Sequence, residues 1–170
     1  MNEDKNLFEE YFNKYKDDVY RVAYYYTKNK DDAEDLLQDT FIRAYRFFYR
    51  FKKNTNFKSW ILKIMRNIYI TGNKKKQREH AISQNIELIP DKSYLPEADS
   101  LNSVTITEMK ESILMLPREF REVIILSDIE GLMYEEIAKI IKIPVGTVRS
   151  RLHRGRLILK ERLRERYNVK

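Results

Sequence analysis

The chain has 170 residues, with 33 lysines and arginines against 26 aspartates and glutamates, and its formal charge is +7. This length allows one large domain or two small ones. No apolar run approaches the roughly 18 residues of a membrane span, and the acidic N-terminus lacks the order of a signal peptide, so a cytoplasmic protein is expected. The absence of cysteine excludes disulfides and thiolate chemistry, and two histidines far apart in sequence do not indicate a zinc site.

The charge is distributed in blocks. Residues 1–42 carry a net charge of −5, residues 43–82 carry +11, residues 83–120 carry −4 and residues 121–170 carry +5. Two basic blocks separated by acidic ones indicate two polyanion-binding surfaces. Chance clustering on solvated helices is the alternative interpretation.

Glycine and proline divide the chain into two helical parts. The first 71 residues contain neither, which is typical of consecutive helices. Residues 74–102 contain Pro90 and Pro96, lack a helical period and indicate a linker. The sequence therefore predicts an all-α fold, with two small helical domains (residues 1–73 and 103–170) joined by a flexible acidic linker.

The first domain begins with aromatic and aliphatic residues at helical spacing, from Phe8 to Tyr26. Asp31 and Glu34 then offer a capping box for a second helix. We expect this helix to bury Leu36, Leu37, Thr40, Phe41, Ala44 and Phe48. Its other face carries Asp35, Gln38, Asp39, Ile42, Arg43 and Arg46. That face is either a solvated surface with one exposed isoleucine or a docking surface for a partner.

A third helix is predicted over about residues 57–71. Its apolar stripe has core-facing spacing and consists of Phe57, Trp60, Ile61, Ile64, Met65 and Ile68. Its opposite side carries Lys63, Arg66, Asn67 and Lys74. The preceding segment, residues 50–57, combines cations, amides and aromatic rings, including Lys53, Asn54 and Asn56. Such a set binds single-stranded nucleic acid through phosphate contacts, stacking on bases and hydrogen bonds to base edges, although most rings of this domain belong to its core.

The second domain has the layout of a helix-turn-helix. Thr105 and Glu108 can cap a first helix, Pro117 can begin the next, and Gly131 allows a left-handed turn after it. A short helix over residues 134–141, a break around Pro144 and a longer basic helix over about residues 145–166 follow. The outward positions of the long helix are Thr147, Arg149, Ser150, Arg151, His153 and Arg154. They can contact bases and phosphates in a major groove, whereas the alternative is a plain helical hairpin with a basic surface.

Several motifs match a known family. The segments 116–123 (LPREFREV), 130–138 (EGLMYEEIA) and 143–154 (IPVGTVRSRLHR) resemble region 4 of bacterial sigma factors, above all the extracytoplasmic-function (ECF) group. The segments 32–41 (DAEDLLQDTF) and 57–61 (FKSWI) are similar to region 2. The resemblance covers nearly the whole chain except the linker.

This resemblance implies a transcription initiation factor, without catalysis or a cofactor, that joins core RNA polymerase and directs it to promoters. It implies that the exposed face of the second helix contacts the polymerase, through Asp35, Leu36, Gln38, Asp39, Ile42 and Arg43. It implies that the loop and the third helix read the −10 element, through Lys53, Asn54, Asn56, Trp60, Lys63, Arg66 and Asn67, and that one base of the separated strand is flipped into a pocket formed by the loop. The duplex −35 element is then read by Thr147, Arg149, Ser150, Arg151, His153 and Arg154. An anti-sigma factor is the further partner that the resemblance suggests.

The linker fits the same interpretation. In the family it threads toward channels of the polymerase that hold nucleic acid. Glu87, Asp91, Glu97 and Asp99 can mimic the charge of a nucleic acid there, although a solvated linker has the same composition.

The sequence departs from the family at three positions. Lys142 occupies a turn position that usually has glycine, where a left-handed backbone costs a non-glycine residue about 1–2 kcal/mol. Met133 replaces a Ser or Thr N-cap that contributes about 1 kcal/mol. Gly155 stands where alanine is common and is expected to soften its helix.

Two other classes of protein compete with this interpretation. A stand-alone helix-turn-helix regulator binds duplex DNA without polymerase, but it leaves the first domain unexplained. A small nuclease needs clustered carboxylates that face inward to hold Mg²⁺. The acidic cluster here, residues 31–39, is instead expected at a helix cap and on an outward face.

Overall fold

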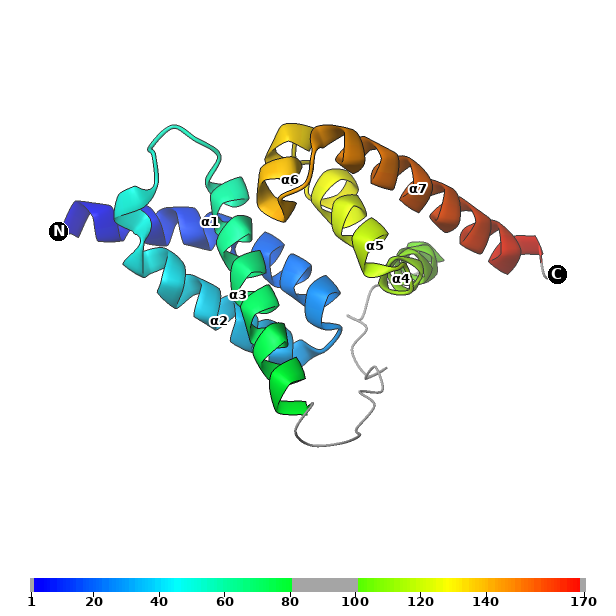
Figure 1. Ribbon diagram of the computed structural model, residues 1–170, viewed down its shortest axis with the longest axis horizontal. Helices are drawn as coiled ribbons and strands as arrows, with labels where there is room; N and C mark the ends of the chain where they lie inside the picture. The colour runs from blue at the N-terminus through cyan, green and yellow to red at the C-terminus, as the bar shows by residue number, and fades with distance from the viewer. Residues whose placement is uncertain (1, 81–100, 169–170) are drawn as a thin grey trace. The chain divides into compact units, whose positions relative to one another are not determined.

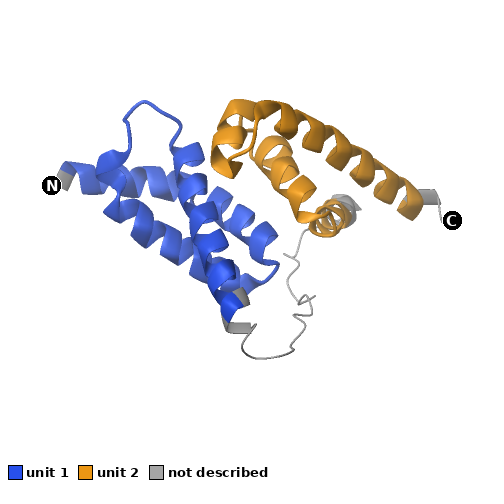
Figure 2. Cartoon of the chain, in the orientation of Figure 1, with its two compact units in different colours: residues 1–91 blue, residues 92–170 orange. Residues whose placement is uncertain are grey.

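A computed structural model describes residues 2–80 and 101–168 of the chain. Within these two ranges the regular structure is helical and no strand occurs, which confirms the predicted all-α class. The chain divides into two compact units, unit 1 with residues 1–91 and unit 2 with residues 92–170 (Figure 1, Figure 2). The acidic residues proposed for the linker, from Glu87 to Asp99, lie outside the described residues. Across the described residues, no helix has the length and apolarity of a membrane span.

Unit 1 consists of α1 (Asn2–Thr27), α2 (Lys30–Arg46), the short 3₁₀ helix η1 (Phe48–Arg50) and α3 (Phe57–His80). The predicted cap of the second helix is wrong. The chain turns through a left-handed Lys28 (φ 58°), and the side chain of Asn29 accepts a hydrogen bond of 3.0 Å from the Asp32 N–H. Asn29 is therefore the N-cap. Asp31 lies inside the first turn, where its carboxylate is stabilised by the positive end of the helix dipole.

An aromatic cluster holds the three helices of unit 1 together. Phe8 is fully buried, and its ring lies 5.2–6.2 Å from five others: Phe12, Phe41, Tyr45, Phe48 and Phe57. These rings come from α1, α2, η1 and α3. Aromatic pairs at such distances add about 0.5–1.5 kcal/mol each beyond the area they bury. Seven of the seventeen aromatic rings of unit 1 are buried, eight are half-buried and two are exposed, so the expectation that most rings are core residues is confirmed for the seven buried rings only.

The predicted buried face of α2 is confirmed in its main part. Leu36, Thr40 and Ala44 are buried, and the Thr40 hydroxyl donates a 2.6 Å hydrogen bond to the Leu36 carbonyl, which satisfies its polar atom. Leu37 and Phe41 are half-buried at the edge of this face.

Helix α3 is longer than predicted, because it ends at His80 and not near residue 71. Its apolar face is buried at Phe57, Ile61 and Met65 as expected, and Leu62 is also fully buried. Within α3, none of the residues after position 70 whose side chains are described is buried. The extra turns form because lysine, arginine and glutamine have high helix propensity and cations favour the negative C-terminal end of a helix. The predicted end of this helix was taken from its apolar spacing, which indicates only where a helix packs against a core. The spacing therefore did not reveal the turns of α3 that continue into solvent.

Unit 2 consists of α4 (Leu101–Leu114), α5 (Arg118–Ile124), the π-helical turn η2 (Ile125–Ile129), α6 (Tyr134–Ile141) and α7 (Val145–Asn168). The predicted start of its first helix at Thr105 is wrong, since α4 begins at Leu101. Pro117 is the N-cap of α5 and not its first residue.

Arg121 joins the first two helices of unit 2. It is buried, and its Nη1 donates hydrogen bonds to the carbonyls of Leu114 (3.0 Å) and Leu116 (3.2 Å). The guanidinium thereby satisfies carbonyl groups that the end of α4 leaves without helical partners.

Two left-handed residues shape the helix-turn-helix, as predicted. Gly131 has φ 67° before α6, and Lys142 has φ 59° and ψ 48° after it. The Ile143 N–H then donates to the Ala138 carbonyl at 3.2 Å and closes α6. Met133 provides no side-chain cap of the usual kind, but its own N–H donates to the Glu136 carboxylate at 3.0 Å. Half of a capping box thus remains.

Gly155 has a different role from the one expected. It is buried against α5, and a Cβ atom there would lie 3.1 Å from Ile124 Cγ1 and 3.3 Å from Phe120 Cβ. Glycine therefore allows α5 and α7 to approach closely, and this close packing offsets the low helix propensity of glycine. Val148 and Leu152 are buried on the same side of α7 and anchor this helix to the core of unit 2.

The left-handed Lys142 gives a direct test of the turn. Replacing Lys142 with glycine removes the clash between its Cβ and the backbone and should stabilise unit 2 by about 1 kcal/mol, or roughly 4–8 °C in Tm. The change in Tm is measured by circular dichroism. Trp60 fluorescence does not report it, because the single tryptophan lies in unit 1. Lys142→Ala keeps the Cβ and is the control, and an equal rise for both variants would contradict this account of the turn.

Candidate nucleic-acid interface

The loop between η1 and α3 is held by two buried rings. Phe51 and Phe57 are 7 % and 3 % exposed, and their ring centroids lie 5.4 Å apart in an edge contact. The five residues between them, Lys52 to Asn56, are all exposed. The expectation that the rings of this loop stack on bases is therefore wrong for Phe51 and Phe57. Both belong to the core, and they present the polar residues between them to solvent.

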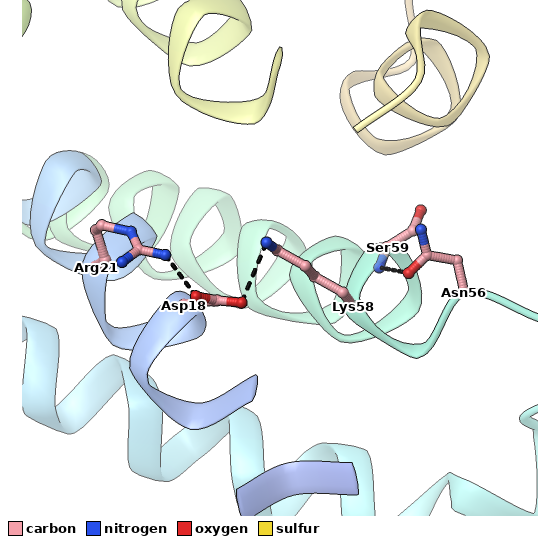
Figure 3. Close-up of polar contacts among 5 residues, drawn as sticks. All are labelled: Asp18, Arg21, Asn56, Lys58 and Ser59. Atoms are coloured by element: carbon pink, nitrogen blue, oxygen red, sulfur yellow. Dashed lines mark hydrogen bonds and ion pairs between the residues drawn. The ribbon is translucent and has the colours of Figure 1, made fainter. Parts of the chain in front are cut away.

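Local hydrogen bonds give the loop a defined shape. The Thr55 hydroxyl donates to the Lys52 carbonyl at 2.7 Å, and Asn54 adopts a left-handed conformation with φ 73°. Asn56 caps α3, because its Oδ1 accepts a 3.2 Å hydrogen bond from the Ser59 N–H (Figure 3). Asn56 is also predicted to contact the −10 element, but its amide oxygen already accepts the hydrogen bond of this cap.

An ion-pair cluster fixes the beginning of α3 to α1. Lys58 Nζ lies 3.1 Å from Asp18 Oδ2, and Arg21 pairs with the other oxygen of the same carboxylate (Figure 3). The Lys58 side chain is only 16 % exposed. Lys58 is therefore a structural cation, whereas the other lysines of this region face solvent.

The residues predicted to contact the −10 element lie on the loop and on α3. Lys53 is exposed and pairs with Asp4 of α1 at 3.2 Å, and such surface pairs contribute little and exchange readily for a phosphate. At 100° per residue, Trp60, Lys63 and Asn67 share one side of α3, and Arg66 lies about 60° from Lys63. Lys63 and Asn67 are exposed, and Trp60 is half-buried at the edge of the aromatic cluster, 5.3 Å from Phe51.

One exposed aromatic group was not predicted. Tyr49 is 73 % exposed, and the Arg50 guanidinium lies 5.2 and 5.3 Å from the rings of Phe47 and Tyr49. Arg50 Nε also donates to the Tyr49 hydroxyl at 3.0 Å. The exposure of Tyr49 could have been predicted from the spacing of Phe48 and Phe51. These two buried residues are three positions apart on one face of a helical turn, so Tyr49 between them is directed outward.

In unit 2, most of the predicted DNA-reading residues are accessible on α7. Arg149, Ser150, His153 and Arg154 are exposed, and Thr147 is half-buried at the start of the helix. Arg151 is the exception. It is half-buried on the flank of α7, where its Nη2 lies 4.0 Å from the Glu119 carboxylate of α5. It therefore lies to the side of the exposed face that the other residues form.

A third surface lies on α2, where the predicted residues Asp35, Gln38, Asp39, Ile42 and Arg43 are all exposed. Ile42 stands out as an aliphatic side chain with 48 % exposure.

Leu36 was predicted to belong to this face, and that prediction is wrong. Leu36 is 6 % exposed, and it lies about 120° around the helix from Ile42, in the core of unit 1. Tyr45, 46 % exposed, extends the apolar part of the face by one turn beyond Ile42.

In the ranges that the structure describes, no group of three His, Cys, Asp or Glu side chains is arranged to hold a metal ion.

Comparison with known proteins identifies both units. The family model of Sigma-70 region 2 matches residues 11–79, and that of Sigma-70 region 4 matches residues 106–159. The chain is 36 % identical over 158 residues to the ECF RNA polymerase sigma factor SigE of Mycolicibacterium smegmatis, covering 92 % of this chain and 61 % of that relative. It is 34 % identical over 173 residues to the ECF RNA polymerase sigma factor SigW of Bacillus subtilis, covering 95 % and 91 %. The chain belongs to the ECF family of RNA polymerase sigma factors.

Solved structures agree with this family. This ECF sigma factor is similar to the sigma factor RpoE from Bartonella quintana, crystallised with the anti-sigma factor NepR, with a TM-score of 0.78, 30 % identity and coverage of 92 % of this chain and 96 % of that one. CnrH, in complex with the cytosolic domain of CnrY, shares the fold with a TM-score of 0.65 at 20 % identity, covering 95 % and 90 %.

The division between core and surface rings in this sigma factor can be tested by paired substitutions. Phe51→Ala should lower the stability of unit 1 by about 3 kcal/mol, because a buried ring is lost and a cavity remains. Tyr49→Ala should cost less than about 0.5 kcal/mol, because its ring faces solvent. Urea unfolding followed by Trp60 fluorescence measures both. Similar losses for the two variants would show that Phe51 is not the anchor described here.

Proposed function

We propose that this sigma factor joins core RNA polymerase and directs it to promoters, with unit 1 recognising the −10 element and unit 2 the −35 element. One observation carries the proposal: the chain matches both sigma regions, and each matching unit presents an exposed cationic face on an ordered helical scaffold. The chain contributes binding and no catalysis or cofactor, and it acts where the polymerase acts, in the cytoplasm.

Unit 1 would capture an unpaired base of the −10 element. Lys52 and Lys53 supply charge for phosphates, and the exposed Asn54 supplies an amide for a base edge. Phe51 and Phe57 act indirectly, because their burial fixes both ends of the loop before DNA arrives. Preorganisation of this kind lowers the entropic cost of binding a flipped base.

Unit 2 would read the −35 element as duplex DNA. The N-terminal half of α7 presents Arg149, His153 and Arg154 outward, with the dipole of the helix favouring a nearby phosphate. Arginine pairs bidentately with guanine, and each such contact discriminates by about 1–3 kcal/mol. Arg151, beside Glu119, is better placed for a phosphate than for a base.

The exposed face of α2 would contact the polymerase. It combines an exposed aliphatic residue, Ile42, with Asp39 and Gln38 on either side, which is the apolar centre and polar rim of a protein interface. An anti-sigma factor is the further partner we propose, since the similar Bartonella quintana sigma factor was crystallised with one.

Run-off transcription tests the proposed function as a whole. Core RNA polymerase is combined with the full chain and a library of templates with randomised −35 and −10 segments. The expected result is a set of start sites that core polymerase alone does not use, with two enriched sequence blocks upstream. Arg149→Ala should relax selection within the upstream block and leave the downstream block unchanged. DNA binding without any change of start site would favour a stand-alone regulator, and metal-dependent cleavage of the templates would favour a nuclease.

The polymerase contact has a matched test on one helix. Asp39→Ala should weaken binding to core polymerase about tenfold, because it removes a carboxylate from the rim around Ile42. Glu34→Ala makes the same change of charge on another side of α2 and should leave the affinity unchanged. Binding is measured by fluorescence anisotropy of the labelled chain titrated with core enzyme. Equal affinities for the two variants would remove the α2 face from the proposed interface.

A further inference from the structure

A bidentate ion pair on one flank of α7 joins this helix to the π-helical turn η2. Arg156 Nε donates to Asp128 Oδ2 at 3.0 Å, and Arg156 Nη2 donates to the second carboxylate oxygen, Oδ1, at 2.6 Å. Two parallel hydrogen bonds of this kind fix the relative orientation of the two groups as well as their distance. We call these two residues the Asp128–Arg156 pair.

Arg156 also contacts the start of α6. The Asp128 carboxylate raises the pKa of the Arg156 guanidinium above its usual value, and a side-chain hydrogen bond with Tyr134 adds to this effect, whereas partial burial opposes it. Tyr134 is the first residue of α6. The guanidinium of Arg156 therefore connects three elements, η2, α6 and α7.

The π-helical turn determines where Asp128 lies. The Glu130 N–H donates to the Ile125 carbonyl at 2.9 Å, a hydrogen bond between residues five apart, whereas an α-helix joins residues four apart. The one extra residue changes the direction of the side chains in this turn relative to a continuous α-helix, by about 100°. Asp128 lies inside the turn and its carboxylate reaches α7. Single π-helical turns are frequent at functional sites.

A second ion pair lies on the opposite flank of α7. At about 100° per residue, Arg151 and Arg156 are about 140° apart around the helix, and the buried Leu152 and Gly155 lie between them. Arg151 Nη2 is 4.0 Å from the Glu119 carboxylate, so the Asp128–Arg156 pair is the tighter of the two. Because α7 is held on both flanks of its buried side, rotation about its own axis is restricted.

Such a rotation would displace the residues that face DNA. The radius of an α-helix with its side chains is about 5–6 Å, so a rotation of about 10° moves the end of a side chain by about 1 Å. Hydrogen bonds to base edges need donor–acceptor distances of about 2.7–3.2 Å, and a 1 Å displacement therefore breaks them. The attraction of a cation to a phosphate decreases much more slowly with distance. Sequence discrimination is therefore more sensitive to the rotation of α7 than overall affinity is.

We infer that the Asp128–Arg156 pair is a positioning pair that sets the rotation of α7 and thereby the sequence discrimination of unit 2 at the −35 element. This inference rests on the proposed function for the DNA that α7 reads. Asp128 is an anion and acts through Arg156, not through a contact with DNA. Exposed ion pairs contribute little to stability, so the role of the pair is to orient α7 and not to fold unit 2.

The rotation of α7 can be measured without DNA or polymerase. The chain has no cysteine, so Lys139→Cys in α6 and Glu161→Cys in α7 provide two defined, exposed sites for spin labels. Double electron–electron resonance then gives the distribution of distances between the labels. We expect a narrow distribution in the labelled parent chain and a broader one after Asp128→Asn. Arg156→Lys should broaden it as well, because an ammonium group keeps the charge but lacks the two-pronged geometry.

A second ion pair of α7 provides the matched control. Arg166 Nη1 lies 3.1 Å from the Glu111 carboxylate of α4, near the C-terminal end of α7 and away from the residues that face DNA. Glu111→Gln removes one carboxylate from an arginine of α7, as Asp128→Asn does. It should leave the distance distribution unchanged.

The effect on discrimination is measured with the holoenzyme. Two templates compete for it, one with the −35 segment selected in the transcription assay and one with that segment scrambled. Asp128→Asn should lower the preference for the selected template about tenfold, which corresponds to the loss of one bidentate arginine–guanine contact. Glu111→Gln should keep the preference of the unchanged chain. All assays are run below the unfolding transition of each variant, as measured by circular dichroism.

The two measurements separate this inference from the proposed function. If the holoenzyme prefers neither template with any variant while the label distances still distinguish Asp128→Asn from Glu111→Gln, the proposed reading of the −35 element fails and the control of α7 rotation stands. Two results would overturn the inference. The first is a distance distribution for Asp128→Asn equal to that of Glu111→Gln, whatever the template preference. The second is that Asp128→Asn raises the affinity for both templates alike, since Arg156 would then bind DNA itself and Asp128 would mask it.

Discussion

The burial of Phe51 and Phe57 is the constraint on which the proposed −10 interface depends. The two rings are six positions apart and contact each other within one aromatic cluster, so the five residues between them have no route except outward. The cap at Asn56 and the ion pairs of Asp18 then orient α3. The result is a polar loop with little freedom, next to a cationic helix. A flexible loop of the same composition would carry the same charges but would lose more entropy on binding.

In unit 2, backbone geometry determines how the exposed cations of α7 are positioned. A left-handed Lys142 turns the chain between α6 and α7, and Gly155 allows α7 to lie close against α5. Val148 and Leu152 anchor the inner side of α7, which leaves Arg149, His153 and Arg154 outside. Both units thus place exposed cations on an element whose opposite side is buried.

The sequence predicted the helices and their buried faces well, because apolar spacing reports packing directly. It failed where packing is not the cause of structure. Helix α3 continues to His80 on propensity and charge alone, and the cap at Asn29 depends on the left-handed Lys28 that precedes it. The apolar spacing placed Leu36 on the buried side of its helix, where it lies, whereas the family resemblance also included it among the polymerase contacts on the exposed side. The loop rings were misassigned for a related reason: composition shows that aromatic residues are present, and only the fold shows which of them are already packed.

Site-specific photocrosslinking in the holoenzyme tests the central claim most directly. A photoreactive amino acid at Asn54 should crosslink to one strand only, at the melted segment, and the same group at Arg149 should crosslink to duplex DNA at a separate upstream segment. Such a result would show two rigid cationic faces bound to one promoter at two places. Crosslinks from both positions to the same segment, or to both strands alike at Asn54, would contradict the account.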